Sequence, residues 1–246
     1  MKNILVIPFL LFGLLANAQT AKEIIEKADE LTRGLSSQGE MTIQIIRPKW
    51  SREMTMKSWT LGTDYSLILI TAPAKEKGTV FLKREKEIWN WLPSIERTVK
   101  LPPSMMMQSW MGTDLTNDDL VKESSIVTDY THKIEKDTVF DGRDCWKLVL
   151  TAKPDAPVVW GSIITYVEKK HYIQLRSEFY DEDEYLVNVF TAHDIKEMGG
   201  RTIATRMEMI PVEKEGHKTV IIQNDLKFNT GVEADFFSTS QMKRLK

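Results

Sequence analysis

The chain has 246 residues, of which 42% are apolar and 28% charged, and its formal net charge is −2. These fractions are ordinary for globular proteins, so they argue against intrinsic disorder and against a multi-spanning membrane protein. The near-neutral charge argues against a nucleic-acid partner. One cysteine, Cys145, cannot form an intrachain disulfide or a multi-cysteine metal site. The chain has the unusual numbers of twelve Met and seven Trp. Met suits either irregular cores or surfaces that adapt to varied apolar ligands.

The N-terminal segment has the pattern of a secretory signal peptide. A positively charged start precedes an apolar run over 4–15, and Ala16 and Ala18 are the small residues that a signal peptidase recognises. The run is too short to cross a hydrocarbon core of ~30 Å as a helix. We therefore expect a signal peptide over 1–18, cleaved after Ala18, and one domain over 19–246 that is exported to a bacterial periplasm.

One amphipathic helix is predicted directly after this segment. Thr20 and Glu23 have the spacing of a capping box, and Gly34 can end the helix. Ile24 and Ala28 fall on one helical face. We expect a helix of roughly 13 residues that packs against another element through this face.

The rest of the chain has mostly the period-two hydrophobic pattern of β-strands. Short apolar runs, one of them over 126–134, alternate with polar turns such as Gly199-Gly200 and the acidic run 181–184. Helical crossovers between the runs are almost absent. This pattern predicts a mainly β fold, an antiparallel sheet of about 11–13 strands that curls into a barrel.

One apolar segment breaks the strand pattern. Residues 104–111 follow two prolines and would be apolar on nearly every face of a helix, which must then be buried or meet apolar material. A turn is predicted over 112–115 and the capped start of another helical turn over 116–119. The segment is either a movable lid that contacts a ligand or a permanent plug of the core.

Sequence motifs of catalytic centres are missing. No H-E-x-x-H, P-loop, G-x-S-x-G or G-x-G-x-x-G pattern occurs, and the four histidines are scattered. The acidic run 181–184 lacks the glycine and the spacing of a calcium loop, so a charged hairpin turn explains it better. Helix capping explains Asp114, Asp118 and Asp119, and Cys145 is expected to be buried. We expect no catalytic residues, no metal, no cofactor and no enzymatic activity.

An exported, Met-rich β-protein without a reaction centre suits the transport of an apolar molecule through water. Burial of an acyl chain is worth about 0.8 kcal/mol per methylene, so a carrier must offer comparable shelter and still release its cargo. A partly closed barrel with a movable lid meets both needs. We expect an apolar hollow of several hundred Å³ beneath residues 104–115.

Three stretches resemble motifs of the outer-membrane lipoprotein-sorting, LolA-like family. Residues 73–82, PAKEKGTVFL, resemble its P-x-x-x-K-G-T-x-F-L strand, and residues 89–93, WNWLP, resemble its W-x-Y-L-P hairpin. Residues 112–120, GTDLTNDDL, are similar to its G-T-D-F-S-Y-x-D-L segment, with Leu115 and Asn117 in place of two aromatic residues. Each motif is weak alone, but the combination is fairly specific.

This resemblance implies an unclosed antiparallel barrel whose mouth is covered by short helices that serve as a lid or plug. It also implies a monomeric periplasmic carrier of lipoproteins or other lipids, with an inner-membrane transporter and an outer-membrane acceptor as transient partners. The family's well-studied carrier holds its empty lid shut with an arginine on a strand. Arg47 is a candidate counterpart that the quoted motifs do not reach.

The residues expected to line an acyl-binding cavity or to form its lid are Phe81, Trp89, Trp91, Met105, Met106, Met107, Trp110, Met111 and Leu115. Trp89 and Trp91 share one strand face, which either lines the cavity or belongs to the core or a rim girdle. Phe81 and Leu82 point to opposite faces, so only one of them can line a cavity. The pairs Met54/Met56 and Met207/Met209 leave the same choice between lining and core. Alternative functions are a non-enzymatic adaptor of an inner-membrane exporter for another apolar cargo, and a periplasmic hydrolase.

Overall fold

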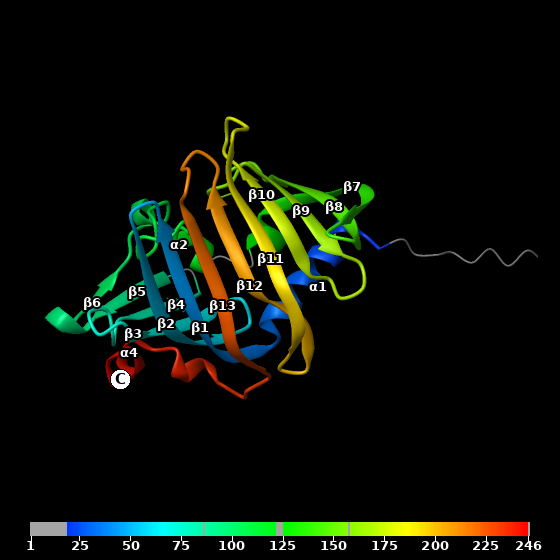
Figure 1. Ribbon diagram of the computed structural model, residues 1–246. Helices are drawn as coiled ribbons and strands as arrows, with labels where there is room; N and C mark the ends of the chain where they lie inside the picture. The colour runs from blue at the N-terminus through cyan, green and yellow to red at the C-terminus, as the bar shows by residue number, and fades with distance from the viewer. Residues whose placement is uncertain (1–18, 86, 122–124, 157, 246) are drawn as a thin grey trace, which may run out of the picture.

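One antiparallel sheet forms most of the molecule in the computed structural model (Figure 1), which describes residues 19–245 apart from 86, 122–124 and 157. The predicted signal peptide over 1–18 lies outside the described residues. The 13 strands follow the order β6-β5-β4-β3-β2-β1-β13-β12-β11-β10-β9-β8-β7. β6 and β7 form the two edges of this order, so the curled sheet stays open. The strand number and the open edge confirm the predicted fold class.

The described residues contain 13 strands and seven helical segments. The strands are β1 (Ser36–Arg47), β2 (Trp50–Leu61), β3 (Tyr65–Ala72), β4 (Val80–Arg84), β5 (Glu87–Leu92), β6 (Arg97–Lys100), β7 (Tyr130–Phe140), β8 (Arg143–Ala152), β9 (Ser162–Glu168), β10 (Gln174–Tyr180), β11 (Leu186–Met198), β12 (Arg201–Pro211) and β13 (Lys218–Phe228). The helices are α1 (Ala21–Arg33), η1 (Pro93–Ile95), η2 (Pro103–Met105), α2 (Asn117–Val121), α3 (Ser125–Thr128), η3 (Ala234–Phe236) and α4 (Thr239–Arg244).

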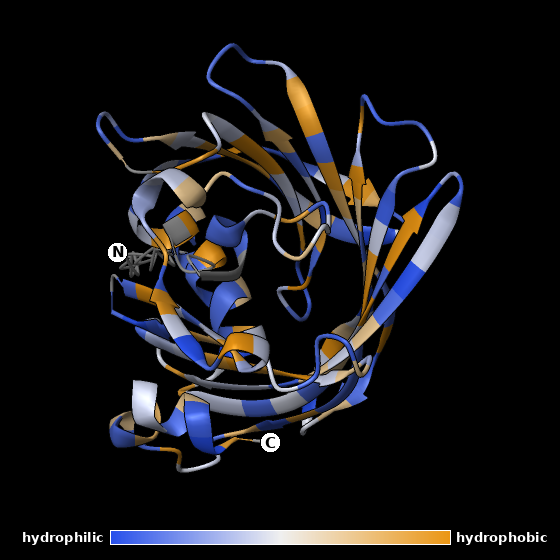
Figure 2. Cartoon of the chain, turned by 90° about the vertical axis from the view of Figure 1, so that its left-hand side faces the viewer, coloured by the Kyte–Doolittle hydropathy of each residue, from blue (hydrophilic) through white to orange (hydrophobic). Residues whose placement is uncertain are grey.

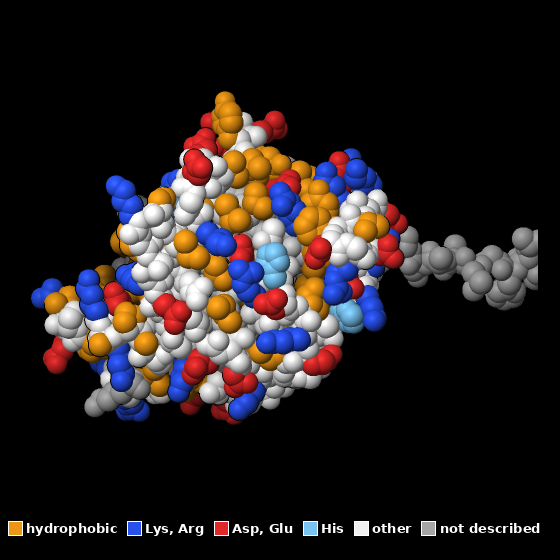
Figure 3. All heavy atoms as spheres, viewed as in Figure 1, with side chains coloured by type: hydrophobic (Ala, Val, Ile, Leu, Met, Phe, Trp, Pro, Cys, Tyr) orange, Lys and Arg blue, Asp and Glu red, His pale blue; other side chains and the backbone are white. Residues whose placement is uncertain are grey.

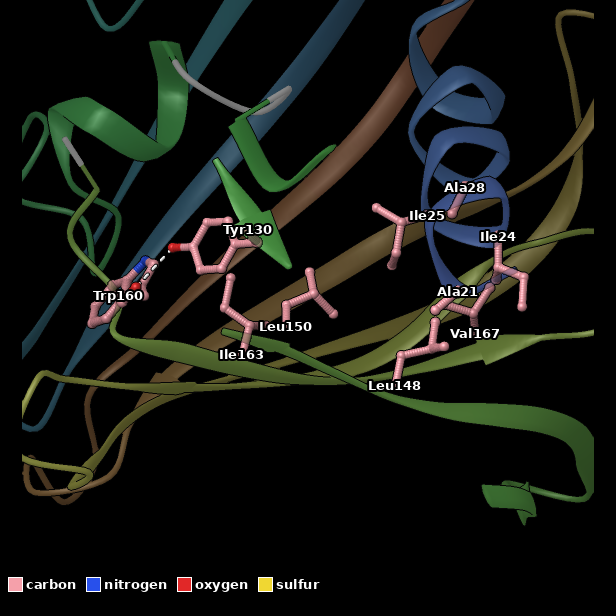
Figure 4. Packing of buried hydrophobic residues seen from close by; sticks show 10 residues of the cluster. All are labelled: Ala21, Ile24, Ile25, Ala28, Tyr130, Leu148, Leu150, Trp160, Ile163 and Val167. Carbon is pink, nitrogen blue, oxygen red and sulfur yellow. Dashed lines mark hydrogen bonds between the residues drawn. The ribbon is translucent and has the colours of Figure 1, made fainter. Parts of the chain in front are cut away.

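Helix α1 begins at the predicted capping box. The Thr20 hydroxyl accepts a hydrogen bond from the Glu23 amide (3.2 Å), and the Glu23 carboxylate accepts one from the Thr20 amide (2.8 Å). Gly34 ends the helix with a positive φ of 64°. Figure 4 shows the apolar face of α1 against strands β8 and β9, where Ile24 lies near Val167. This core fills one side of the curled sheet.

The segment before β7 is helical, so the strand predicted over 126–134 starts too early. Helix α3 occupies Ser125–Thr128, and β7 begins at Tyr130. Ile126 and Val127 pack against the α1 core instead of entering the sheet. The Tyr130 hydroxyl donates a hydrogen bond to the Trp160 carbonyl (2.9 Å), which fixes the start of the strand in that core.

An apolar row crosses five strands on the concave face, which the sheet curves around short helices and loops (Figure 2). Side chains that lie opposite each other on paired strands share a face. Such pairs connect one residue on each of five neighbouring strands: Met54 on β2, Ile43 on β1, Ile221 on β13, Met207 on β12 and Ala192 on β11. We call these five residues the apolar row. The same registers place Met41, Met56 and Met209 on this face, so both predicted methionine pairs are concave.

The convex face of β3 to β5 is covered by the end of the chain. Leu67, Val80 and Leu82 pack with Phe237 and Met242 from the segment of η3 and α4. Phe81 belongs to the opposite, concave cluster. This arrangement confirms that Phe81 and Leu82 point to opposite faces.

Candidate functional site

A loop over residues 104–115, which we call the lid, lies on the concave face. Its helical part is one short turn, η2, so the helix expected over 104–111 is wrong. The chain turns back where Met111 and Gly112 have positive φ angles of 51° and 79°. The Trp110 amide therefore donates to the Leu115 carbonyl across the loop (2.8 Å) rather than along a helix.

Trp110 is the centre of the contact between the lid and the sheet. Its side chain is 2% exposed and packs in one cluster with Met54, Met56 and other concave residues. Its ring meets that of Phe81 at an angle of 62°, with 5.3 Å between the ring centroids. Met111 lies partly buried in the same cluster. The lid thus covers the β1–β4 half of the concave face with one large apolar side chain.

A buried ion pair fastens the tip of the lid. Arg47, at the end of β1, donates hydrogen bonds to the Gly112 carbonyl (2.8 Å) and to Asp114 Oδ2 (3.0 Å). Thr219 on β13 donates to the same carboxylate (2.7 Å) and accepts from the Asp114 amide (2.8 Å). The Arg47 and Asp114 side chains are only 9% and 5% exposed. We call Arg47, Asp114 and Thr219 the latch.

A second arginine reinforces this latch. Arg52 on β2 donates a hydrogen bond to the Met111 carbonyl and forms an ion pair with Glu76 (3.3 Å) from the β3–β4 loop. Two strands therefore supply guanidinium groups to the adjacent carbonyls of Met111 and Gly112. Arg52 is not among the predicted site residues, although the sequence carries a signal for it: Arg52 is a charged residue on the strand face that also carries Met54.

Helix α2 ties the lid to the opposite side of the sheet. Thr116 and Asp119 bond reciprocally as a cap, each amide to the other's side chain at 2.7 and 3.1 Å, which confirms the predicted capped turn. Trp160 Nε1 donates a hydrogen bond to Asp119 Oδ1 (3.2 Å). Asn117 donates to the Met105 carbonyl (2.8 Å), which joins α2 to the start of the lid. Asp119 is thus a capping residue as expected, whereas helix capping is the wrong explanation for Asp114, because its carboxylate binds Arg47 and Thr219.

The hollow beneath the lid is much smaller than expected. It measures about 20 Å³ and lies between Trp110, Phe81, Ile68 and Leu101. That volume accommodates about one water molecule. The expectation of several hundred Å³ is therefore wrong for this closed arrangement, because the lid itself, with Trp110 at its centre, fills the space above the sheet.

The predicted site residues divide into two groups. Phe81, Trp110 and Met111 come together on the concave face, with Leu115 buried in the lid at 7% exposure. Of the remaining lid methionines, two are half-buried and Met107 is 62% exposed.

Trp89 and Trp91 lie apart from this group. They pack in the convex cluster beneath the C-terminal segment, opposite Leu82 and Val80 on β4. Lys243 of α4 lies over the Trp91 ring, 5.7 Å from its centroid. This placement matches the core alternative. The strand alternation alone could not choose between the faces, because the covering segment follows about 140 residues later in the chain.

The methionine pairs that the sequence left undecided lie on the concave face of the sheet. Met54 and Met56 are fully buried beneath the lid, whereas Met41, Met207 and Ile221 are only half-buried. Met41 and Ile221 pack against the cluster that contains Trp110. The wall is therefore partly accessible even while the latch is closed.

The described residues contain no grouping of three His, Cys, Asp or Glu side chains that could hold a metal ion. Asp181 Oδ1 accepts hydrogen bonds from the amides of Asp183 (3.0 Å) and Tyr185 (2.9 Å), which confirms the predicted charged turn. Burial raises the pKa of the Cys145 thiol, so it stays protonated and weakly nucleophilic. None of the described helices is long and apolar enough to span a membrane.

Comparisons with known proteins place this architecture. A family model described as "Uncharacterized protein" matches residues 62–244, and no curated protein matches the chain. A DUF1329 family protein from Desulfovibrio piger is 23% identical with a TM-score of 0.81, covering 90% of this chain and 97% of that one. A putative outer membrane lipoprotein-sorting protein domain from Vibrio parahaemolyticus is 24% identical with a TM-score of 0.79, covering 91% and 98%.

A LolA superfamily protein from Nitrosomonas europaea is 23% identical with a TM-score of 0.78, covering 91% of this chain and 100% of that one. At these identities, the likeness to solved structures concerns the fold. The family model, in contrast, matches most of the chain. The chain therefore belongs to the family that this model describes, and it has the fold of the LolA-like outer-membrane lipoprotein-sorting proteins.

Proposed function

We propose that this protein is a non-enzymatic periplasmic carrier that shelters acyl chains of lipoproteins or other lipids against its concave face. The observation that carries the proposal is the apolar row on the concave face. A short lid covers part of this face, and arginine contacts fasten the lid to the sheet. An inner-membrane transporter would load the carrier and an outer-membrane acceptor would unload it, each in a transient complex.

The concave wall has the composition that acyl chains require. Five methionines share it, namely Met41, Met54, Met56, Met207 and Met209. Their unbranched thioether chains adapt to guests of different length and branching. A chain of sixteen carbons gains about 12 kcal/mol on leaving water, so the wall must replace that water with apolar contact over the chain's length.

Loading requires the lid to move, because Trp110 occupies the space that a guest needs. The contacts of Trp110 with Phe81 and the methionines are apolar and non-directional, so an acyl chain can replace them at little cost. The hydrogen bonds of Arg47 and Arg52 are directional and concentrated on residues 111–114. Breaking these few bonds frees the tip of the lid while the sheet remains intact.

Native mass spectrometry with a triacylated lipopeptide tests this function. We expect a one-to-one complex with the wild-type protein. Met207→Glu puts a charge on the concave wall and should abolish the complex, whereas Ile210→Glu lies on the other face of the same strand and should preserve it. A wild-type protein that stays empty at all lipopeptide concentrations would contradict the proposal.

A second candidate function is a non-enzymatic adaptor of an inner-membrane exporter for another apolar cargo. The filled space beneath the lid favours it, because a hollow of about 20 Å³ shelters no acyl chain. The same titration decides between the two. An adaptor would bind its exporter without lipopeptide uptake, and Met207→Glu would leave that binding unchanged.

A further inference from the structure

The turns at one end of the sheet form a continuous rim around the lid. Antiparallel order puts the turns that follow β1, β3, β5, β8, β10 and β12 at the same end, which lies at the top of Figure 1 for the labelled β10–β11 hairpin. Contacts join neighbouring turns, since Gly78 lies against Pro93 and Gly216 lies against Pro48. The Val212 amide also donates to the Val187 carbonyl (2.9 Å). We call the turns over 48–50, 73–79, 93–96, 181–185 and 212–217 the mouth rim.

Four of the six turns at this end carry an exposed large apolar side chain, and the described residues of the β8–β9 turn over 153–161 and of the β3–β4 turn over 73–79 do not. Trp50 is 52% exposed, Ile95 56%, Tyr185 68% and Val212 48%. Single exposed apolar residues are common on protein surfaces, but turn tips normally carry Gly, Pro, Asn, Asp or Ser. The recurrence of exposed apolar side chains on separate turns around the lid therefore indicates a surface that contacts a binding partner.

We propose that the mouth rim docks on the surface of a phospholipid bilayer with zwitterionic headgroups. The apolar tips stand apart on separate turns, whereas a protein interface has a contiguous, closely packed apolar centre. A fluid headgroup layer can accept each tip independently. Trp and Tyr, which supply two of the tips, are the residues that favour the boundary between hydrocarbon and water.

The charged residues of the mouth rim indicate whether the bilayer has zwitterionic or anionic headgroups. The β10–β11 turn places Asp181 to Glu184 beside Tyr185, and the top of Figure 3 shows apolar and acidic side chains together there. The β3–β4 turn, on the other side of the rim, carries Lys75 and Lys77. Anionic lipids bind continuous basic clusters, which this rim lacks. Apolar insertion into a neutral surface therefore dominates, and salt should not release the protein.

Docking at this end has a structural consequence for the lid. The Trp50 ring lies under the Arg47 guanidinium, with 5.9 Å between its centroid and Cζ. A bilayer that receives Trp50 therefore meets the latch directly. The rim would also bring the concave face to the lipid, although docking itself does not depend on the proposed cargo.

Flotation with large unilamellar phosphatidylcholine vesicles tests docking. The test variant is Tyr185→Ser/Val212→Ser, which spares the latch, and the matched control is Leu35→Ser/Val139→Ser, since those exposed residues lie at the opposite end. We expect the wild type and the control to float, and the rim variant to lose about tenfold in vesicle affinity. Equal thermal unfolding of all three confirms that the exposed changes leave the fold intact.

Several results would overturn the proposal: no flotation of the wild type, equal losses in both variants, release by 0.5 M salt, or binding only when anionic lipid or membrane proteins are present. The last result would instead identify an electrostatic membrane contact or a protein partner. Lipopeptide uptake in the absence of vesicles separates this outcome from a failure of the carrier function. A protein that takes up lipopeptide but ignores vesicles remains a carrier without this docking surface.

Discussion

The Arg47 guanidinium and the Asp114 carboxylate meet at 3.0 Å across a sequence separation of 67 residues, and they join strand β1 to the lid. Both side chains are nearly buried, so each depends on the other for charge compensation. The side chain of Trp110, in contrast, holds the closed lid to the sheet through apolar contacts. The position of the lid is thus specified by ionic and polar contacts at its tip, while the space beneath it suits an apolar guest.

Arg47→Gln should loosen the lid. Removing one partner of a buried ion pair costs roughly 3–5 kcal/mol, and opening the lid relieves part of that cost by letting water reach Asp114. We expect a lower free energy of unfolding in urea and faster proteolytic cleavage within residues 104–115. Lys100→Gln is the matched control, because its pair with Glu87 is exposed and contributes at most about 1 kcal/mol. Equal losses in the two variants would contradict the role of the latch.

Trp110→Ala should create a site that an acyl guest can refill. Deleting a buried Trp side chain costs about 3–5 kcal/mol, and a ligand that binds only the folded state restores stability by mass action. We expect a lipopeptide to raise the melting temperature of this variant more than that of the wild type. Trp91→Ala removes a packed Trp from the convex face, so its melting temperature should gain no more than that of the wild type. Equal rescue of both would refute a concave site.

Glu208 should make stability depend on pH. Burial alone would raise the pKa of its carboxyl group, but hydrogen bonds and charge from Lys218 and Arg206 together lower it from the ordinary value of 4.5. A lowered folded-state pKa adds stability above that ordinary value, and the contribution is lost as the pH falls through the folded-state pKa. Urea unfolding of Glu208→Gln should therefore differ from the wild type at pH 7 and converge with it in acid. Glu215→Gln changes an exposed turn residue and is the control. Its free energy of unfolding should equal that of the wild type at pH 7.

Cys145 should react slowly with alkylating reagents. Burial raises its thiol pKa, and the side chain is 0% exposed. Only the thiolate attacks iodoacetamide, so we expect little labelling of the native protein at pH 8 and rapid labelling in urea. Mass spectrometry measures both rates. Native labelling as fast as that of the unfolded chain would show that the cluster around Cys145 opens readily.

Local signals in the sequence were sufficient for helix α1 and for the sheet. The capping box at Thr20 and Glu23 involves neighbours in the chain, and the period-two runs with polar turns reflect alternation within each strand. Both patterns therefore predict structure without knowledge of distant contacts. The start of β7 differs from the predicted run because Ile126 finds its apolar partners on α1.

The lid could not be derived in the same way. Its apolar residues satisfy a helical pattern equally well, and contacts with the distant residues Arg47, Arg52 and Thr219 favour the hairpin-like loop instead. The face of Trp89 and Trp91 likewise depends on the C-terminal segment that covers them. Strand alternation fixed which side chains share a face, but tertiary contacts decide which face is concave.

Photo-crosslinking shows whether acyl chains lie along the apolar row. A lipopeptide with a diazirine at the middle of one acyl chain would be irradiated in complex with the protein, and the labelled peptides identified by mass spectrometry. We expect labels on β2, β12 and β13 at Met54, Met207 and Ile221. Labels confined to the convex residues Trp89 and Trp91, or no label at saturating lipopeptide, would contradict it.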